Sequence, residues 1–160
     1  MIKINVIVKN KSWDKHLNNP KKYLEKKVKK LNKKIALFKK TSFYITMLLS
    51  GEKDIRYLNK KFRKKNSSSD VLSFPFYEKK DLLNLINKKE KIYLGDIILN
   101  FEKIKKNLDK KNFINRFDEL WVHSILHLYG YKHSKDKDYK KMNKLENNIL
   151  SEINESFTNY

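Results

Sequence analysis

The stretch SFYITMLLS, residues Ser42–Ser50, is rich in β-branched, aromatic and aliphatic side chains. Such a composition predicts a buried strand. Gly51 follows it directly and predicts its end. Further strands are predicted at residues 2–8, 70–76 and 93–100, which flank this stretch on both sides along the chain.

Three details of these strands bear on the predicted sheet. In residues 2–8, apolar side chains alternate with others, which is the period of a strand with one buried face. Pro75 has no N–H to donate, so the strand over residues 70–76 is predicted to lie at an edge or to end there. Gly95 interrupts the strand over residues 93–100 and predicts a β-bulge.

Apolar residues at helical spacing predict the remaining elements. The predicted helices cover residues 20–38, 54–62, 81–88, 101–110 and 115–129, and a last one begins at Asp136 or Asp138. Asn19 is the predicted cap of the first helix and Asp54 that of the second. We find no repeat or linker, and expect residues 1–160 to form a single α/β (α+β) domain with a mixed four-stranded sheet and about five helices.

The composition restricts the partners and the metal ligands. The chain contains no cysteine, so a site for a soft metal must use histidine and carboxylate. Its formal net charge of +20 predicts a polyanionic partner such as nucleic acid. A coding sequence rich in A and T would also raise the lysine content, but it does not explain why only 18 acidic residues oppose the bases.

The same sequence gives no sign of a membrane or an export signal. No apolar run approaches the roughly 18–20 residues that span a bilayer. The lysine-rich helices also lack the bulky aromatic face of membrane-surface helices. The amino terminus has neither the long apolar stretch nor the small-residue cleavage site of a signal peptide. We therefore expect a soluble, cytoplasmic protein with no membrane partner.

Three of the four histidines lie within eleven residues, in the stretch HSILHLYGYKH from His123 to His133. Residues four apart share a helix face, so His123 and His127 can converge on one ion. Gly130 can adopt a left-handed conformation, which would end the helix and return His133 to the same point. Three imidazoles leave a fourth zinc position for water, as in catalytic sites, and predict one Zn²⁺ per chain. His16 is predicted to be a surface residue.

The same spacing, HxxxHxxGxxH, occurs in the metzincin proteases. In those enzymes a glutamate directly after the first histidine acts as the general base. Here that position is Ser124, which cannot act as a base at neutral pH. A metzincin-like hydrolase of another substrate is therefore a disfavoured alternative. Zinc can still activate a bound water, because it lowers the pKa of that water to roughly 7.

Three motifs together resemble the YbeY family of bacterial endoribonucleases, also called rRNA maturation factors. The histidine stretch matches the family pattern HGxLHLxGYDH at all three histidines and at Leu126, Leu128, Gly130 and Tyr131. It departs from that pattern at Ser124 and Lys132. Residues 58–75 are similar to LNxxYRxKDxPTDVLSFP, with departures at Asn66, Ser68 and Ser69, and Leu94–Ile97 match LGDI. The motifs follow one another in the family's order.

This resemblance implies a zinc-dependent endoribonuclease that cleaves single-stranded RNA in small-subunit rRNA maturation and ribosome quality control. It implies that the histidines hold the metal and that Arg63 is the arginine of the cleft. A guanidinium can grip a phosphate through two hydrogen bonds, and can oppose the charge that builds up as a metal-activated hydroxyl attacks the phosphodiester. The expected partners are single-stranded RNA, rRNA and the small ribosomal subunit.

Other residues are candidates for supporting roles. Asp96 and Asp70 could hold a ligand histidine in place, and Asp96 could instead bond to an RNA hydroxyl. A hydrogen bond at the end of its strand is an equal alternative for Asp96, and Asp70 could orient the preceding loop. Lys132 would put a cation beside the metal. Trp121 and Tyr129 are more often core residues than platforms for base stacking.

A non-catalytic ribosome-assembly factor is the main alternative. In that case the basic surface would bind rRNA while zinc only supported the fold. The three-ligand set argues against a purely structural zinc, because structural sites almost always have four protein ligands.

Overall fold

The chain folds into four strands and seven helices within residues 1–36, 39, 41–86 and 88–154, which the computed structural model describes. The strands are β1 (Ile2–Val8), β2 (Ser42–Ser50), β3 (Val71–Pro75) and β4 (Lys91–Asn100). The helices are α1 (Ser12–Leu17), α2 (Pro20–Lys34), α3 (Glu52–Arg63), α4 (Lys79–Ile86), α5 (Phe101–Lys105), α6 (Lys110–Leu128) and α7 (Asp136–Asn154). The predicted α+β class and all four predicted strands are confirmed.

The four strands form one mixed sheet in the order β1-β2-β4-β3. Strand β2 is parallel to both β1 and β4, and β3 is antiparallel to β4. The stretch SFYITMLLS therefore occupies an interior position, as its composition predicts. Pro75 ends β3 at the edge of the sheet, where a missing N–H removes no bond between interior strands.

Gly95 produces the bulge that is predicted in β4. The pairing with β2 shifts by one residue after Tyr93, so that Leu94 is an extra residue of β4. The φ of Gly95 is 138°, and a Cβ on this residue would lie 2.1 Å from the carbonyl oxygen of Phe74. Any larger residue would therefore push β3 away from β4.

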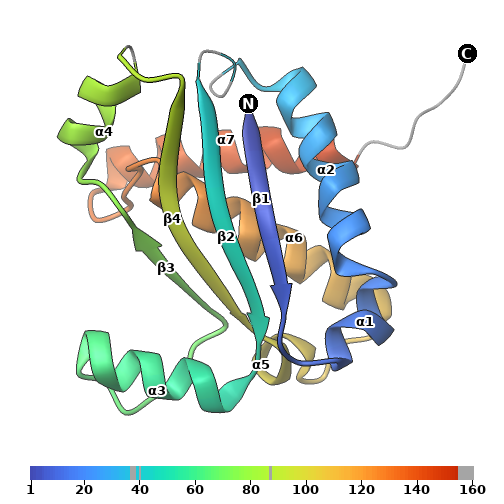
Figure 1. Ribbon diagram of the computed structural model, residues 1–160. Helices are drawn as coiled ribbons and strands as arrows, with labels where there is room; N and C mark the ends of the chain where they lie inside the picture. Colours follow the sequence, from blue (N-terminus) through green and yellow to red (C-terminus); the bar gives the residue numbers. More distant parts are fainter. Residues whose placement is uncertain (37–38, 40, 87, 155–160) are drawn as a thin grey trace, which may run out of the picture.

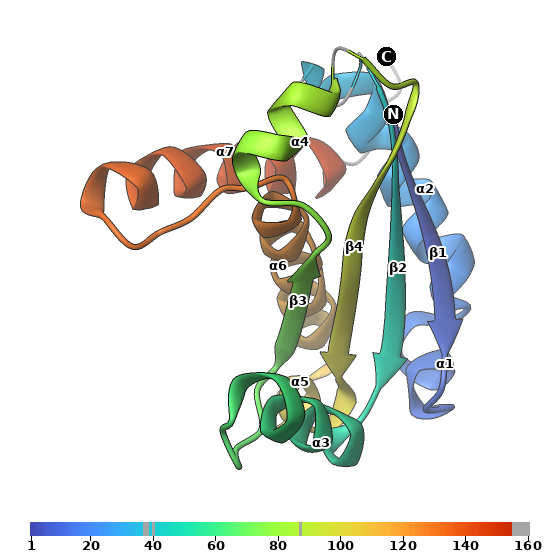
Figure 2. The same cartoon turned by 60° about the vertical axis from the view of Figure 1, so that its left-hand side comes forward.

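The two faces of the sheet have different surroundings. Figures 1 and 2 show α6 and α7 behind the strands and α2 along the side of β1. Between these layers lies the main core, in which Phe43 of β2 and Trp121 of α6 are almost fully buried. On the opposite face, α3 is the described helix that packs against the strands, with Ile55 over Leu72 and Ile98. The rest of that face carries no helix in Figure 1.

Several helix ends differ from the predicted ones. Asp54 is not a cap, because α3 begins at Glu52 with Gly51 as its N-cap. The carboxylate of Asp54 instead accepts hydrogen bonds from Lys9 and from the hydroxyl of Ser50, and so ties α3 to the ends of β1 and β2. The cap predicted at Asn19 is confirmed, since its side chain accepts from the N–H of Lys22 at 3.1 Å.

The segment between β4 and the histidines is divided differently from the prediction. The helix predicted over residues 101–110 ends at Lys105. A new helix, α6, then begins at Lys110, where the side chain of Asp109 accepts from the N–H of Asn112 at 2.8 Å. Two predicted helix ends reach residues 37–38 and 87, which lie outside the described residues. The described parts of α2 and α4 end at Lys34 and Ile86.

Helix α1 was not predicted from the sequence. This helix is fixed by Trp13, which is fully buried and donates from Nε1 to the carbonyl of Ser50 at 2.9 Å. The prediction of His16 as a surface residue is wrong in part. Its ring is half-buried, with its centroid 4.9 Å from that of Phe101. Within the described part of the chain, no helix has the length and apolar character needed to cross a membrane.

Candidate metal centre

The three clustered histidines lie at the end of α6 and in the loop that follows it. The ring centroids of His123 and His127 are 4.5 Å apart. The ring of His133 is 5.5 Å from that of His123 and 4.9 Å from that of His127. One ligand atom from each ring lies within 4.8 Å of the other two. The predicted convergence is confirmed, and the three side chains are placed to bind one metal ion.

Gly130 turns the chain so that His133 returns to α6. Its φ is 90°, in the left-handed region. Its N–H donates to the carbonyl of His127, and the N–H of Tyr131 donates to that of Leu126, both at 2.9 Å. These two bonds are those of a Schellman C-cap. Gly130 therefore ends α6 with a Schellman C-cap, as its predicted left-handed conformation allows, and this turn sets the position of His133.

Hydrogen bonds fix the tautomers of the two helical histidines. The Nδ1 atom of His123 lies 3.0 Å from Oε2 of Glu146, and the Nδ1 atom of His127 lies 3.0 Å from the carbonyl oxygen of Tyr131. Because an ionised carboxylate and a carbonyl only accept, each Nδ1 carries the proton. Each Nε2 then keeps a lone pair, which is the form that binds a metal.

The two free nitrogen atoms face one another. The Nε2 atoms of His123 and His127 are 2.9 Å apart. Two lone pairs at that distance repel unless a cation or a proton lies between them. Ligand nitrogens in a tetrahedral site with bonds of about 2.0–2.1 Å are separated by about 3.3 Å. The arrangement thus fits a divalent metal ion with imidazole ligands.

The centre is shielded on one side and open on the other. His123 and His127 are half-buried, whereas His133 is exposed. Burial lowers the pKa of His127, and the neighbouring ring of His123 lowers it further, so that the neutral imidazole is favoured at neutral pH. A neutral ring is the state that a metal requires, and exposure at His133 leaves an approach for a substrate.

Glu146 is a site residue that the sequence analysis did not identify. It lies on α7, and its side chain is 17% exposed while it contacts His123. Metal-binding histidines commonly donate their second N–H to a carboxylate, which orients the ring and raises its basicity. Glu146 supplies this contact because α7 packs against α6.

The carboxylates that were predicted to support the ligands have other partners. Asp96 accepts a hydrogen bond from the hydroxyl of Tyr93, on the open face of the sheet. Asp70 accepts from Arg116 at 3.0 Å. Among the hydrogen bonds of the described residues, none joins Asp96 or Asp70 to a histidine of the triad. Glu146 takes the place that was predicted for them.

Arg63 ends α3, at the opposite end of β3 from α4 (Figures 1 and 2). It is exposed, and within the described part of the chain it makes no hydrogen bond or ion pair. The other two arginines are paired, Arg56 with Glu52 and Arg116 with Asp70 and Glu119. The structure therefore leaves the guanidinium of Arg63 available for an anion, although it does not bring it into contact with the triad.

The two departures from the histidine pattern, Ser124 and Lys132, differ in exposure. Ser124 is fully buried, and its hydroxyl has no hydrogen-bond partner among the described residues, so no contact activates it as a base. Lys132 is exposed and lines a hollow with Lys79, Lys141 and Asp138. These lysines put positive charge beside the triad. Trp121 and Tyr129 are buried, which confirms that they are core residues.

Comparison with known proteins gives consistent matches along the chain. A family model described as Endoribonuclease YbeY matches residues 7–154. The chain is 41% identical over 162 residues to the endoribonuclease YbeY of Pelagibacter ubique, with 96% of this chain and 97% of that protein covered. It is 38% identical to the endoribonuclease YbeY of Thermodesulfovibrio yellowstonii, with 81% and 78% covered.

A solved structure shares the fold. The solution structure of TM1509 from Thermotoga maritima superposes with a TM-score of 0.59 at 27% sequence identity. The match covers 96% of this chain and 89% of that one. The arrangement of sheet and helices described above is thus found in a protein of known structure.

Proposed function

The chain belongs to the endoribonuclease YbeY family, and on that premise we propose that it is a zinc-dependent enzyme that cleaves single-stranded RNA. We further propose that its substrate is rRNA of the small ribosomal subunit, in maturation and in ribosome quality control. Such a role would place the protein in the cytoplasm. The net charge of +20 supports a polyanionic substrate.

One observation carries the zinc assignment. Three imidazoles converge, and in His123 and His127 it is Nε2 that faces the centre, because Glu146 and the carbonyl of Tyr131 accept from the Nδ1 atoms of these two rings. Nitrogen ligands suit zinc, and a set of three leaves a position for water or substrate. A bound zinc would act as a Lewis acid and lower the pKa of water to roughly 7.

The side chains around the centre have separate tasks. Glu146 orients His123 by accepting from its Nδ1, which directs Nε2 toward the metal position. Lys79, Lys132 and Lys141 attract the phosphate backbone to the exposed side of the triad. Arg63 lies apart from this group, at the end of α3. We propose that it binds a phosphate of the RNA through two hydrogen bonds and stabilises the charge that develops on it when the RNA spans both places.

Removal and return of the metal tests the proposal. Purified protein is expected to contain about one zinc per chain and to cleave an unstructured RNA. A chelator should abolish cleavage, and added zinc should restore it, because the triad can be refilled. A hairpin of equal length serves as the control and should be cut more slowly. Cleavage that persists without metal would overturn the zinc assignment, and a zinc-loaded protein that binds RNA without cutting it would indicate an assembly factor.

Substitution of Arg63 should affect cleavage and leave the metal in place. Arg63→Ala is expected to lower the cleavage rate by about 100-fold, the typical effect of losing one group that stabilises transition-state charge. Arg63→Lys should give an intermediate rate, because lysine keeps the charge and loses the two-bond grip. Arg56→Ala is the matched control and should cleave at the normal rate, since Arg56 is paired with Glu52. Equal rates for the Arg63 and Arg56 variants would remove Arg63 from the mechanism.

Substitution of Glu146 should weaken the metal site. Glu146→Ala is expected to lower zinc affinity by about 10- to 100-fold, because His123 loses the partner that orients its ring. Competition with a zinc-binding dye measures this effect without an activity assay. Glu146→Gln should bind zinc more tightly than the alanine variant, since its amide oxygen can still accept from Nδ1. Unchanged affinity in Glu146→Ala would show that the contact does not support the site.

A further inference from the structure

The open face of the sheet carries a row of aromatic side chains beside lysines. Lys3, Tyr44 and Tyr93 are aligned across β1, β2 and β4. Phe76 extends this row past the end of β3, because its N–H donates to the carbonyl of Leu94 at 2.8 Å. We call the three rings of Tyr44, Tyr93 and Phe76, together with Lys3, the aromatic row.

The rings of this row are accessible from solvent. Phe76 is 64% exposed, and Tyr44 and Tyr93 are half-buried. The rings of Phe76 and Tyr93 meet edge to face at 5.8 Å, and the ammonium of Lys3 lies 5.5 Å from the ring of Tyr44. A contiguous apolar patch on a protein surface marks an interaction site, in contrast to single exposed rings. The accessible ring faces of this patch can stack on a flat ligand.

A polar row lies next to the aromatic one. Asn5, Thr46 and Asp96 are aligned across β1, β2 and β4, and Phe74 of β3 completes the row. Asp96 is the sole acidic residue among the strand positions described on this face, and the hydroxyl of Tyr93 hydrogen-bonds to it. These groups can donate to and accept from the edges of bases that stack on the neighbouring rings.

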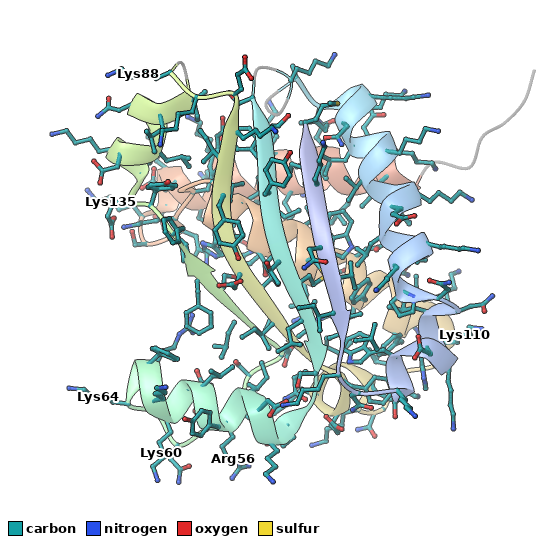
Figure 3. The ribbon with its side chains drawn as sticks, in the orientation of Figure 1. Arg56, Lys60, Lys64, Lys88, Lys110 and Lys135 are labelled. Atoms are coloured by element: carbon teal, nitrogen blue, oxygen red, sulfur yellow. The ribbon has the colours of Figure 1, made fainter. Side chains whose placement is uncertain are left out.

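Positive charge surrounds the face. Lys3 and Lys91 are exposed at its upper end and line one hollow with Tyr44 and Tyr93. Figure 3 shows Lys64, after α3, and Lys88, after α4, at the edge of the molecule on the side of β3. Aromatic platforms inside a positively charged surround are the usual means of binding single-stranded nucleic acid.

The open face is connected to the metal centre by a short segment. Phe76 packs on Tyr77, with the ring centroids 5.0 Å apart. The ammonium of Lys79 lies 5.6 Å from the ring of Tyr131, whose carbonyl holds His127. Figures 1 and 2 show α6 behind the edge strand β3. A strand bound on the face could therefore pass around β3 toward the triad.

We propose that the open face, through Tyr44, Tyr93 and Phe76, binds single-stranded RNA by base stacking and delivers it around β3 to the metal centre. The choice of RNA as the ligand of this face rests on the proposed nuclease function. Its contribution is affinity and selection of unpaired RNA, because bases within a duplex cannot lie flat on the rings.

Binding of a short, fluorescent, single-stranded RNA with 2′-O-methyl riboses tests the surface apart from cleavage. Tyr44→Val and Phe76→Val are each expected to weaken binding by about tenfold, the loss of one stacked base. Tyr44→Phe keeps the ring and should bind like the unaltered protein. Tyr57→Val should also bind normally, since Tyr57 is 61% exposed on α3 and pairs with Lys61 away from the row. Circular dichroism confirms the fold of each variant.

The outcomes separate this proposal from the nuclease. Normal RNA binding by Tyr44→Val and Phe76→Val, or no RNA binding by the unaltered protein, overturns the proposed role of the open face, even if the protein cleaves RNA. Weakened binding in both variants, together with no cleavage by zinc-loaded protein, supports the surface and overturns the nuclease. Weakened binding with intact catalysis of a saturating RNA supports both.

Discussion

Replacing His127 by alanine is expected to remove the bound metal and to lower RNA cleavage by at least about 100-fold, because metal catalysis contributes several kcal/mol to such reactions. The remaining two imidazoles cannot hold zinc tightly, since His133 is exposed and lies in a loop. The helix should survive, because alanine has the highest helix propensity and His127 is only half-buried. Metal analysis by mass spectrometry, a cleavage assay and a thermal melt measure the three effects.

His16→Ala is the matched control for this variant. His16 is also half-buried, but it lies on α1 against Phe101 and Phe113 and outside the triad. It should keep the full zinc content and the full rate. A His127→Ala protein that retained one zinc per chain would show that the triad is not the metal site. Retained cleavage after loss of the metal would instead separate the metal from catalysis.

The metal ligands could be predicted from the sequence because their geometry is local. His123 and His127 are one helical turn apart. The left-handed conformation of Gly130 ends the helix and turns the chain so that His133 lies beside them. Each of these relations spans fewer than eleven residues. The regular geometry of a helix and its C-cap therefore determines them before any tertiary contact is considered.

Glu146 could not be predicted in this way. It lies 23 residues after His123 and on another helix, and it reaches that ring only because α7 packs against α6. Asp96 and Asp70 were chosen from motifs, and motifs carry no information about the direction of a side chain. Asp96 points to the open face because of its place after the bulge at Gly95. A one-residue shift in a strand exchanges its two faces.

The fold shows the same division between local and distant contacts. The composition of Ser42–Ser50 and the alternation in residues 2–8 predicted strands correctly. The strand order β1-β2-β4-β3 depends on pairing between distant segments, and no short pattern encodes it. Helix α1 was missed because its six residues are too few for a periodicity, and Trp13 fixes it through a contact with Ser50.

Removal of the Asp118 carboxylate is expected to lower the free energy of unfolding more than any other substitution proposed for this protein. Asp118 is 1% exposed, on the side of α6 that faces α2. It accepts hydrogen bonds from Tyr23 and Trp121 at 2.9 Å, and forms an ion pair with Lys27 at 3.0 Å. Burial and the charge of Asp118 raise the pKa of Tyr23, so the phenol stays protonated and donates. Four side chains from two helices thus form one buried network.

Asp118→Ala would leave a largely buried ammonium, a phenol and an indole N–H without their acceptor. Breaking a buried ion pair by removing one partner costs about 3–5 kcal/mol, so the free energy of unfolding in urea should fall by that amount. Glu119→Ala is the control, because the Glu119 side chain is 47% exposed and its bond to Arg116 is worth less than about 1 kcal/mol. Similar losses for the two variants would mean that water reaches Lys27 and replaces the lost carboxylate. A much larger loss for Asp118→Ala would show that this network holds α2 against the helix that carries the metal ligands.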